Sequence, residues 1–223
     1  MPPVRSLYVS LAAALATASC GSDRAAPTAP DASITAETPG RQIVVLGDSL
    51  AVSPSRSQSF PAVLQARLDG RHPGWTIRNE SVSGDTTGGG VRRLDAAVTT
   101  ESRILVLELG ANDGLRGIAI ETIEQNLSTI IERAQARGIR VLLCGMETPP
   151  LRSWNYSVEF HRVFPRIASR YGVPLVPFLL EGVALNPELN GDDTIHPNAA
   201  GARRIADTVW PYLDALVSQV AAR

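Results

Sequence analysis

The sequence predicts an α/β fold, a three-layer α/β/α sandwich around a central, mostly parallel sheet. Two observations predict it. Short continuous apolar runs, such as 42–46 (QIVVL) and 104–109 (ILVLEL), have the composition of strands that are buried on both faces. Segments with helical spacing of their apolar residues lie between these runs, and such an alternation indicates a parallel sheet with helices on both sides.

The expected elements alternate along the chain. Strands are expected at 42–46, 75–79, 104–109, 140–144 and 175–178. Helices are expected at 60–68, 91–98, 121–137, 158–171 and 198–220, and the last of them is expected to bend near Pro211. The clearest helix is 121–137, whose apolar residues form one stripe and which Gly138 is suited to end.

The first 20 of the 223 residues have the pattern of a secretory signal: Arg5, an apolar stretch over 7–18, and small residues around Cys20. The stretch is shorter than the roughly 20 apolar residues that span a bilayer. Small residues before Cys20 resemble a bacterial lipoprotein cleavage site, although Thr17 replaces the usual Leu. We expect export to the bacterial periplasm or cell envelope with a lipid anchor on Cys20. The alternative is ordinary cleavage nearby, with Cys20 removed or free.

Residues 21–40 lack apolar periodicity and are rich in Ala, Pro, Thr and Ser, which predicts a flexible linker. The folded domain is therefore expected over 41–223. The second cysteine, Cys144, lies in an apolar run and is expected to be a buried thiol, so no disulfide framework is predicted.

Composition excludes several classes of function. The net charge of -1 argues against a nucleic-acid partner, which requires a basic face. The chain contains no lysine, which excludes Schiff-base chemistry and a phosphate loop with its lysine.

Polar residues follow the predicted strands in 47–50 (GDSL), 83–86 (SGDT) and 110–114 (GANDG), and again in 193–197 (DTIHP) before the last helix. Ligands bind at the carboxyl ends of strands in such folds, so these loops are expected along one edge of the sheet. They supply a hydroxyl, glycine N–H groups, a carboxamide, a carboxylate and an imidazole, which together suit acyl transfer.

The order Ser…Asp…His resembles that of the α/β-hydrolases, but their G-x-S-x-G motif is absent. Asp193 and His196 are three residues apart, so one short turn can supply both. Each residue also has a structural interpretation. Ser49 could be a helix N-cap, Gly84 a turn glycine with positive φ and Asn112 a loop cap, while Asp192 competes with Asp193 as the partner of His196.

Other polar residues are expected to have structural roles. Asp48 and Asp113 are expected to brace loops rather than to catalyse, and His72 and His161 are expected at the surface. The pair 92–93 (RR) is expected on the solvated face of a helix.

Four blocks in order give a specific resemblance. Ser49 in GDSL, Gly84 in SGDT, Asn112 in GAND and His196 in D-x-x-H-P match the blocks for which the SGNH hydrolases, also called GDSL esterases/lipases, are named. The resemblance spans about residues 42–215 and implies the flavodoxin-like fold of that family. It also implies that 41–223 is an SGNH hydrolase domain.

The resemblance implies a role for each matching residue. Ser49 would be the nucleophile, His196 the general base, and Asp193 the residue that orients His196. The oxyanion hole would consist of the Ser49 and Gly84 backbone N–H groups and the Asn112 side chain. No cofactor and no metal are implied.

Two stretches, Glu108–Gly117 (ELGANDGLRG) and Val173–Val183 (VPLVPFLLEGV), are similar to the bacterial periplasmic arylesterase, lysophospholipase and acyl-CoA thioesterase subgroup. The chain departs from this subgroup at 151–156 (LRSWNY), where an Asn-Tyr-Gly-like turn is usual. That loop lines the acyl site in the family, so the resemblance leaves the acyl-chain preference open.

The expected function is that of a cofactor-free, monomeric serine esterase acting on a small acyl ester or thioester. Two alternatives are a carbohydrate O-deacetylase on the same scaffold and a non-catalytic binding protein of the cell envelope.

Overall fold

The computed structural model describes residues 40–148 and 152–222. The predicted signal segment with Cys20, and the predicted linker up to residue 39, lie outside these residues. Within the part that is described, no helix is long and apolar enough to cross a membrane.

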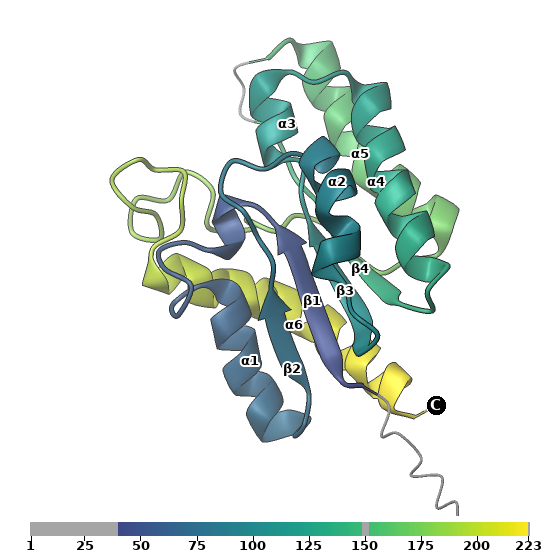
Figure 1. Cartoon of the computed structure of the whole chain (residues 1–223). Coiled ribbons are helices and arrows are strands. Elements are labelled where there is room, and N and C mark those ends of the chain that lie inside the picture. Colours follow the sequence, from purple (N-terminus) through teal and green to yellow (C-terminus); the bar gives the residue numbers. More distant parts are fainter. Residues whose placement is uncertain (1–39, 149–151, 223) are drawn as a thin grey trace, which may run out of the picture. The chain divides into compact units, whose positions relative to one another are not determined.

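Five parallel strands form one sheet in the described part of the chain, in the order β2-β1-β3-β4-β5 (Figure 1). The strands are β1 (Gln42–Gly47), β2 (Thr76–Asn79), β3 (Ser102–Glu108), β4 (Arg140–Cys144) and β5 (Leu175–Val176). All five expected strands are present, and the predicted parallel sheet is confirmed.

Helices cover both faces of the sheet (Figure 1). On one face, α1 (Phe60–Arg71) packs against α6 (Ala199–Ala221). On the other face, α4 (Ile120–Gln135) packs between α2 (Thr87–Ala97) and α5 (Trp154–Tyr171). The predicted three-layer α/β/α architecture is therefore confirmed.

The central strands are buried because they are apolar along their whole length. Residues 43–46 of β1 and 104–107 of β3 have no exposed surface, as expected for strands between two helical layers. Phe160 and Phe164 of α5 pack edge-on, with ring centroids 5.5 Å apart, and extend this core on the α5 side. Cys144 is a buried free thiol, as expected.

Two short helices at the carboxyl edge of the sheet differ from the expectation of loops. Residues Ser49–Ala51 form the 3-10 helix η1, and Ala111–Arg116 form α3. Both are too short to show apolar periodicity, which is the signal that identifies a helix in a sequence.

Helix α2 begins at Thr87, four residues before the expected start at 91. Glycines 88–90 disfavour a helix by propensity, so tertiary contacts must stabilise it. The Thr86 hydroxyl accepts from the Gly89 N–H at 3.2 Å. A side chain at Gly90 would lie 2.4 Å from Leu109 Cδ1, so glycine lets the helix approach the sheet closely.

Helix α6 is held against the loop that precedes it by a close approach at Gly201. A Cβ at this position would lie 2.0 Å from the Leu189 carbonyl oxygen, which is a backbone atom that cannot rotate away. We expect Gly201→Ala to destabilise the fold by about 1–3 kcal/mol, although alanine favours helices intrinsically.

Gly70→Ala is the matched control, because Gly70 lies in α1 and a Cβ there meets nothing within 4 Å. It should stabilise the protein by roughly 0.5–1 kcal/mol. Urea unfolding of both variants measures these changes, and two changes of the same sign would contradict the packing argument.

Candidate active site

The strand order places two polar loops side by side. In a sheet of order 2-1-3-4-5 the crossovers run in opposite directions from β1 and β3, and the ligand site of such folds is the crevice between their carboxyl ends. Ser49 follows β1, within η1, and Asn112 follows β3, within α3. The topology therefore brings the hydroxyl and the carboxamide to one place.

A continuous hydrogen-bonded chain links Ser49, His196 and Asp193. Ser49 Oγ lies 2.8 Å from His196 Nε2, and His196 Nδ1 lies 2.5 Å from Asp193 Oδ2. Because a carboxylate only accepts, the proton of the neutral imidazole lies on Nδ1 and leaves Nε2 free to accept from the serine hydroxyl. This is the geometry of an activated serine nucleophile.

The turn that carries Asp193 and His196 is stabilised by Asp193 itself. Its Oδ1 accepts the backbone N–H groups of Ile195 at 3.0 Å and His196 at 2.9 Å. The hydrogen bond from the His196 ring to Oδ2, together with these two backbone bonds, holds the pKa of Asp193 below its ordinary value. Asp193, and not its rival Asp192, contacts His196.

Two backbone N–H groups of the predicted oxyanion hole, those of Ser49 and Gly84, have no partner in the described part of the chain. Gly84 has φ +76, so it is also the turn glycine of the structural interpretation. Arg116 of α3 donates to the Gly84 carbonyl at 2.9 Å and so ties this turn to the helix that carries Asn112.

Asp48 contacts both the turn that carries Ser49 and the Asn112 side chain. Asp48 Oδ1 accepts the Leu50 N–H at 3.0 Å and caps η1, while Oδ2 accepts from Asn112 Nδ2 at 2.9 Å. Glu108, the last residue of β3, accepts the Asp48 N–H at 3.0 Å. Sequence reasoning assigned Asp48 to bracing a loop and did not single out Glu108 individually, since a lone Glu ending an apolar run carries no distinctive pattern.

Burial changes the acidity of these two groups. Both side chains are fully buried. Desolvation raises the pKa of Asp48 to about 6, against the opposing effect of its hydrogen bonds to Leu50 and Asn112. Desolvation, reinforced by the nearby Asp48 charge, raises the pKa of Glu108 well above its ordinary value.

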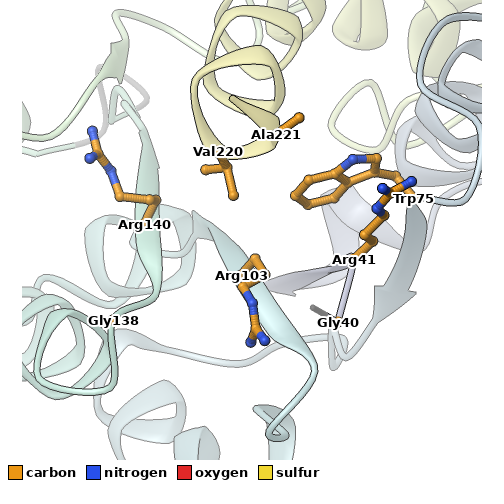
Figure 2. Close-up of a pocket in the computed structure, with 8 residues that line it drawn as sticks. All are labelled: Gly40, Arg41, Trp75, Arg103, Gly138, Arg140, Val220 and Ala221. Carbon is orange, nitrogen blue, oxygen red and sulfur yellow. The ribbon is translucent and has the colours of Figure 1, made fainter. Parts of the chain in front are cut away.

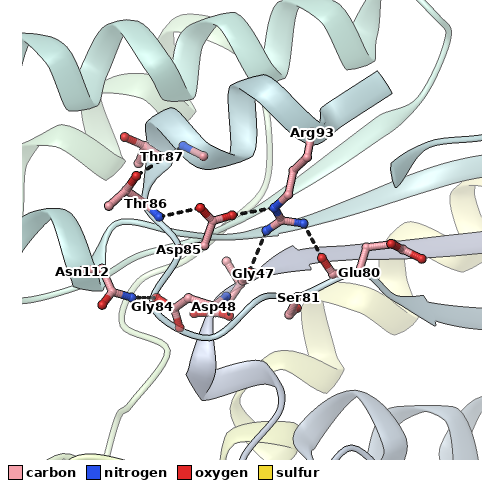
Figure 3. Close-up of polar contacts among 12 residues, drawn as sticks. Gly47, Asp48, Glu80, Ser81, Gly84, Asp85, Thr86, Thr87, Arg93 and Asn112 are labelled. Atoms are coloured by element: carbon pink, nitrogen blue, oxygen red, sulfur yellow. Dashed lines mark hydrogen bonds and ion pairs between the residues drawn. The ribbon is translucent and has the colours of Figure 1, made fainter. Parts of the chain in front are cut away.

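Arg93 corrects the expectation that positions 92–93 form a solvated face. Its guanidinium donates to the Gly47 carbonyl at 2.8 Å, to Asp85 Oδ2 at 2.5 Å and to the Glu80 carbonyl (Figure 3). One side chain of α2 therefore joins the end of β1 to the loop after β2. An arginine on a helix gives no sequence signal of such an interior role.

Asp113 braces the site, as expected. It accepts from the Thr87 N–H at 2.9 Å and the Thr87 hydroxyl at 2.6 Å, which joins α3 to the start of α2. Its burial raises its pKa above the ordinary value.

The other two histidines lie outside the site. His161 is exposed, as expected, and pairs with Glu147 at 2.5 Å. The expectation of an exposed His72 is wrong: its ring is mostly buried, lies 2.6 Å from Asp214 Oδ1 and tilts against Trp210. Among the residues that the structure describes, no three His, Cys, Asp or Glu side chains gather as a group able to hold a metal ion.

A pocket of about 310 Å³ lies at the opposite edge of the sheet, near the starts of the strands. Its lining includes Arg41, Arg103, Arg140 and Trp75 (Figure 2). It contains no nucleophile or general base, so the chemistry of the site places catalysis at the carboxyl edge instead.

Exposed apolar side chains lie close in the sequence to three of the predicted site residues. Val82, Leu115 and Ile195 are large, exposed hydrophobic residues, and each lies within three residues of Gly84, Asn112 or His196 in the sequence. Single exposed hydrophobic residues are ordinary, whereas several of them on the loops that carry the site residues are consistent with an apolar ligand.

The segment that departs from the subgroup pattern adjoins this region. Leu151 lies outside the described residues. Arg152 donates to the Leu115 carbonyl, the Tyr156 hydroxyl donates to the Ile118 carbonyl at 2.9 Å, and Trp154 is 81% exposed. The departure therefore changes the surroundings of α3.

Comparison with known proteins agrees with this geometry. Residues 45–204 match the model of the GDSL-like lipase/acylhydrolase family. The chain is 38% identical to esterase TesA of Pseudomonas aeruginosa over 187 residues, covering 82% of this chain and 93% of that protein. It is 35% identical over 179 residues to the Escherichia coli protein named thioesterase 1/protease 1/lysophospholipase L1, covering 79% and 85%.

Solved structures share the fold. The crystal structure of TesA superposes with a TM-score of 0.74 at 39% identity, covering 78% of this chain and 99% of that one. The psychrotrophic esterase EstA from Pseudoalteromonas sp., in a structure inhibited by monoethylphosphonate, superposes with a TM-score of 0.75 at 29% identity, covering 80% and 99%.

The raised pKa of Asp48 has a consequence for stability. In the unfolded chain an aspartate ionises near pH ~4, so between about pH 4 and pH 6 the folded protein holds a proton that the unfolded chain has lost. Stability therefore falls as the pH rises through this window. With a native pKa of about 6, Asp48 lowers the free energy of unfolding by about 2–3 kcal/mol between these limits.

Asp48→Asn removes this titration. Urea unfolding of the wild type and the variant between pH 4 and pH 7 should show that the difference between them changes with pH, the wild type losing more stability. Parallel pH profiles would contradict the raised pKa.

Proposed function

Because the chain belongs to the GDSL-like lipase/acylhydrolase family and is a hydrolase of ester bonds, we propose that Ser49 is the nucleophile of a serine esterase. One observation carries the assignment of residues: the continuous chain from Ser49 Oγ through His196 to Asp193, with links of 2.8 and 2.5 Å. The roles follow from the atoms that each residue presents.

In the acylation step, Ser49 Oγ attacks the carbonyl carbon of the ester while His196 Nε2 takes the hydroxyl proton. The carbonyl oxygen becomes an oxyanion that receives hydrogen bonds from the Ser49 and Gly84 N–H groups and the Asn112 side chain. Asp193 stabilises the imidazolium. When the intermediate collapses, the carbonyl–leaving-group bond breaks and His196 donates its proton to the departing alcohol or thiol.

Water then repeats the sequence on the acyl-enzyme. His196 takes a proton from the attacking water, the Ser49 ester bond breaks, and the proton returns to Ser49 Oγ as the carboxylic acid leaves. The cycle needs only the side chains and backbone groups of the site.

The substrates we propose are aryl esters, short-to-medium acyl esters, thioesters and lysophospholipids. The names of relatives support these classes: an arylesterase of Vibrio mimicus at 38% identity, and the E. coli thioesterase/lysophospholipase. The exposed Val82, Leu115 and Ile195 support an acyl chain rather than a sugar beside the serine. This argues against the alternative of a carbohydrate O-deacetylase, as the intact Ser–His–Asp chain argues against a non-catalytic binding protein.

Ser49→Ala should abolish essentially all hydrolysis and leave the fold intact, because it removes only the attacking oxygen. The measurement uses p-nitrophenyl esters of increasing chain length, an acyl-CoA thioester, a lysophospholipid and acetylated xylan, with circular dichroism to verify folding. Ser57→Ala is the control, since Ser57 is an exposed serine.

Persistent ester hydrolysis by Ser49→Ala would overturn the nucleophile assignment. Activity of the wild type on acetylated xylan alone would favour the deacetylase. Failure of a fluorophosphonate probe to label Ser49 in the wild type would favour the binding protein.

We further propose export to the bacterial periplasm or cell envelope, with lipid attached at Cys20, and a monomeric enzyme. The support is the apolar stretch over 7–18 followed by small residues. The full chain, expressed in a bacterium, should sediment with membranes and incorporate a fatty-acid label, and Cys20→Ser should lose the label. An unlabelled wild-type protein would leave an ordinary signal peptide as the explanation.

A further inference from the structure

Two buried acids lie behind the nucleophile turn and have no role in the proton transfers. Glu108 is opposite Gly47 in the β1–β3 register, and Asp48 is the next residue along. Both carboxyl groups are fully buried, and neither forms an ion pair with a basic side chain in residues 40–148 and 152–222. Burying acidic groups is costly unless they serve as hydrogen-bond partners, so their contacts indicate their purpose.

The two hydrogen bonds that the Asp48 carboxylate accepts come from the turn after Ser49 and from Asn112. Its Oδ1 orders the turn after Ser49 through the Leu50 N–H, and its Oδ2 accepts one N–H of the Asn112 carboxamide at 2.9 Å. A carboxamide nitrogen carries two hydrogens in a fixed plane. When Asp48 holds one of them, the direction of the other is set.

Glu108 in turn holds Asp48. Its Oε2 accepts the Asp48 N–H at 3.0 Å, and it packs against Gly47, where a Cβ would lie 2.2 Å from that same oxygen. Glycine at position 47 therefore lets the carboxyl group of β3 reach the backbone that follows β1.

We propose that Asp48 and Glu108 are positioning residues of the oxyanion hole: Glu108 fixes the Asp48 backbone, and Asp48 aims the second N–H of Asn112 at the substrate carbonyl oxygen. The inference rests on the proposed serine-esterase function. It assigns to the Asp of the GDSL block a role that acts through Asn112 rather than on the substrate.

Burial and the nearby charged groups affect the acidity of Asp48 and Glu108. Burial raises the pKa of both groups, that of Asp48 to about 6 and that of Glu108 well above its ordinary value. The charged or titratable groups that act on the pair are Arg93, His196 and Asp85, with Cys144 beside Glu108. An anionic Asp48 accepts at both oxygens, as its two contacts require.

The first test is a double-mutant cycle in the full chain. Asp48→Asn keeps the shape but has one acceptor oxygen for two N–H donors, so one N–H of Leu50 or Asn112 faces an amide nitrogen. We expect kcat on a p-nitrophenyl ester to fall by about 10–100-fold with KM changed less than about threefold, because an oxyanion donor acts in the transition state. Asn112→Ala should lower kcat by about 10²–10³.

In the Asn112→Ala background, Asp48→Asn should lower kcat by less than about a further threefold, because the side chain that Asp48 positions is already absent. A double variant whose loss of kcat equals the product of the two single losses would overturn the inference. Asp95→Asn is the matched control at an exposed acid on α2 and should leave kcat unchanged.

The second test separates positioning from a purely structural role. The swap Asp48→Asn with Asn112→Asp restores a donor–acceptor pair in reverse but leaves no N–H at position 112. Thermal stability should return toward that of the wild type, while kcat stays at the level of Asn112→Ala. Recovery of kcat together with stability would contradict the proposal.

Glu108 is tested by rescue. Glu108→Ala removes the acceptor of the Asp48 N–H and should lower kcat about tenfold, whereas Glu108→Gln keeps a carbonyl oxygen there and should recover most of the loss. Equal losses in both variants would overturn the role of Glu108. An inactive wild type, or an active Ser49→Ala, would instead show that the proposed function itself has failed.

Discussion

The pairing of β1 with β3 is the constraint on which the site depends. Gly47 and Glu108 are register partners at the ends of two parallel strands, so the chain leaves both strands at the same edge of the sheet. The residues that follow, Ser49 on one side and Asn112 on the other, are then neighbours without any long loop to bring them together.

Helix α3 turns this proximity into a fixed arrangement. It is only six residues long, yet it is tied to three other segments: Asn112 to Asp48, Asp113 to Thr87, and Arg116 to the Gly84 carbonyl. Helix α3 carries one of the three groups that face the proposed oxyanion, Asn112, and two of the segments it joins carry the other two, Ser49 and Gly84. A helix this short has little stability of its own, so its hydrogen bonds, rather than its propensity, keep the donors in register.

Most of the fold could be predicted because the strands and long helices have strong periodic patterns. The elements that the sequence did not reveal are those stabilised by tertiary contacts, namely α3 and the glycine-rich first turn of α2. In the site, four short blocks and the Asp193–His196 spacing singled out the residues that the structure brings together. The interior roles of Arg93 and Glu108 could not be predicted, since they depend on which loops lie within reach of each side chain.

The site contains acids in two opposite environments, and the environments match the two proposed roles of pairing with His196 and positioning Asn112. Asp193 is exposed, and hydrogen bonds from the His196 ring and from its own turn lower its pKa, so it stays ionised beside the imidazole that becomes cationic in the proposed mechanism. Asp48 and Glu108 are buried behind β1 and β3, where desolvation raises their pKa values. In the proposed mechanism, the negative charge of Asp193 stabilises the protonated His196. A negative charge that faced the oxyanion directly would repel it. A buried acid such as Asp48, which contacts the neutral Asn112 carboxamide and not the substrate, therefore suits the oxyanion hole better. The loop with Asp193 and His196 is held by the bridge between Asn190 and Pro197 and by the Asn198 cap of α6. The part of the site that follows β1 and β3 and the part that precedes α6 are thus built by different elements, and they meet where Ser49 Oγ contacts His196 Nε2.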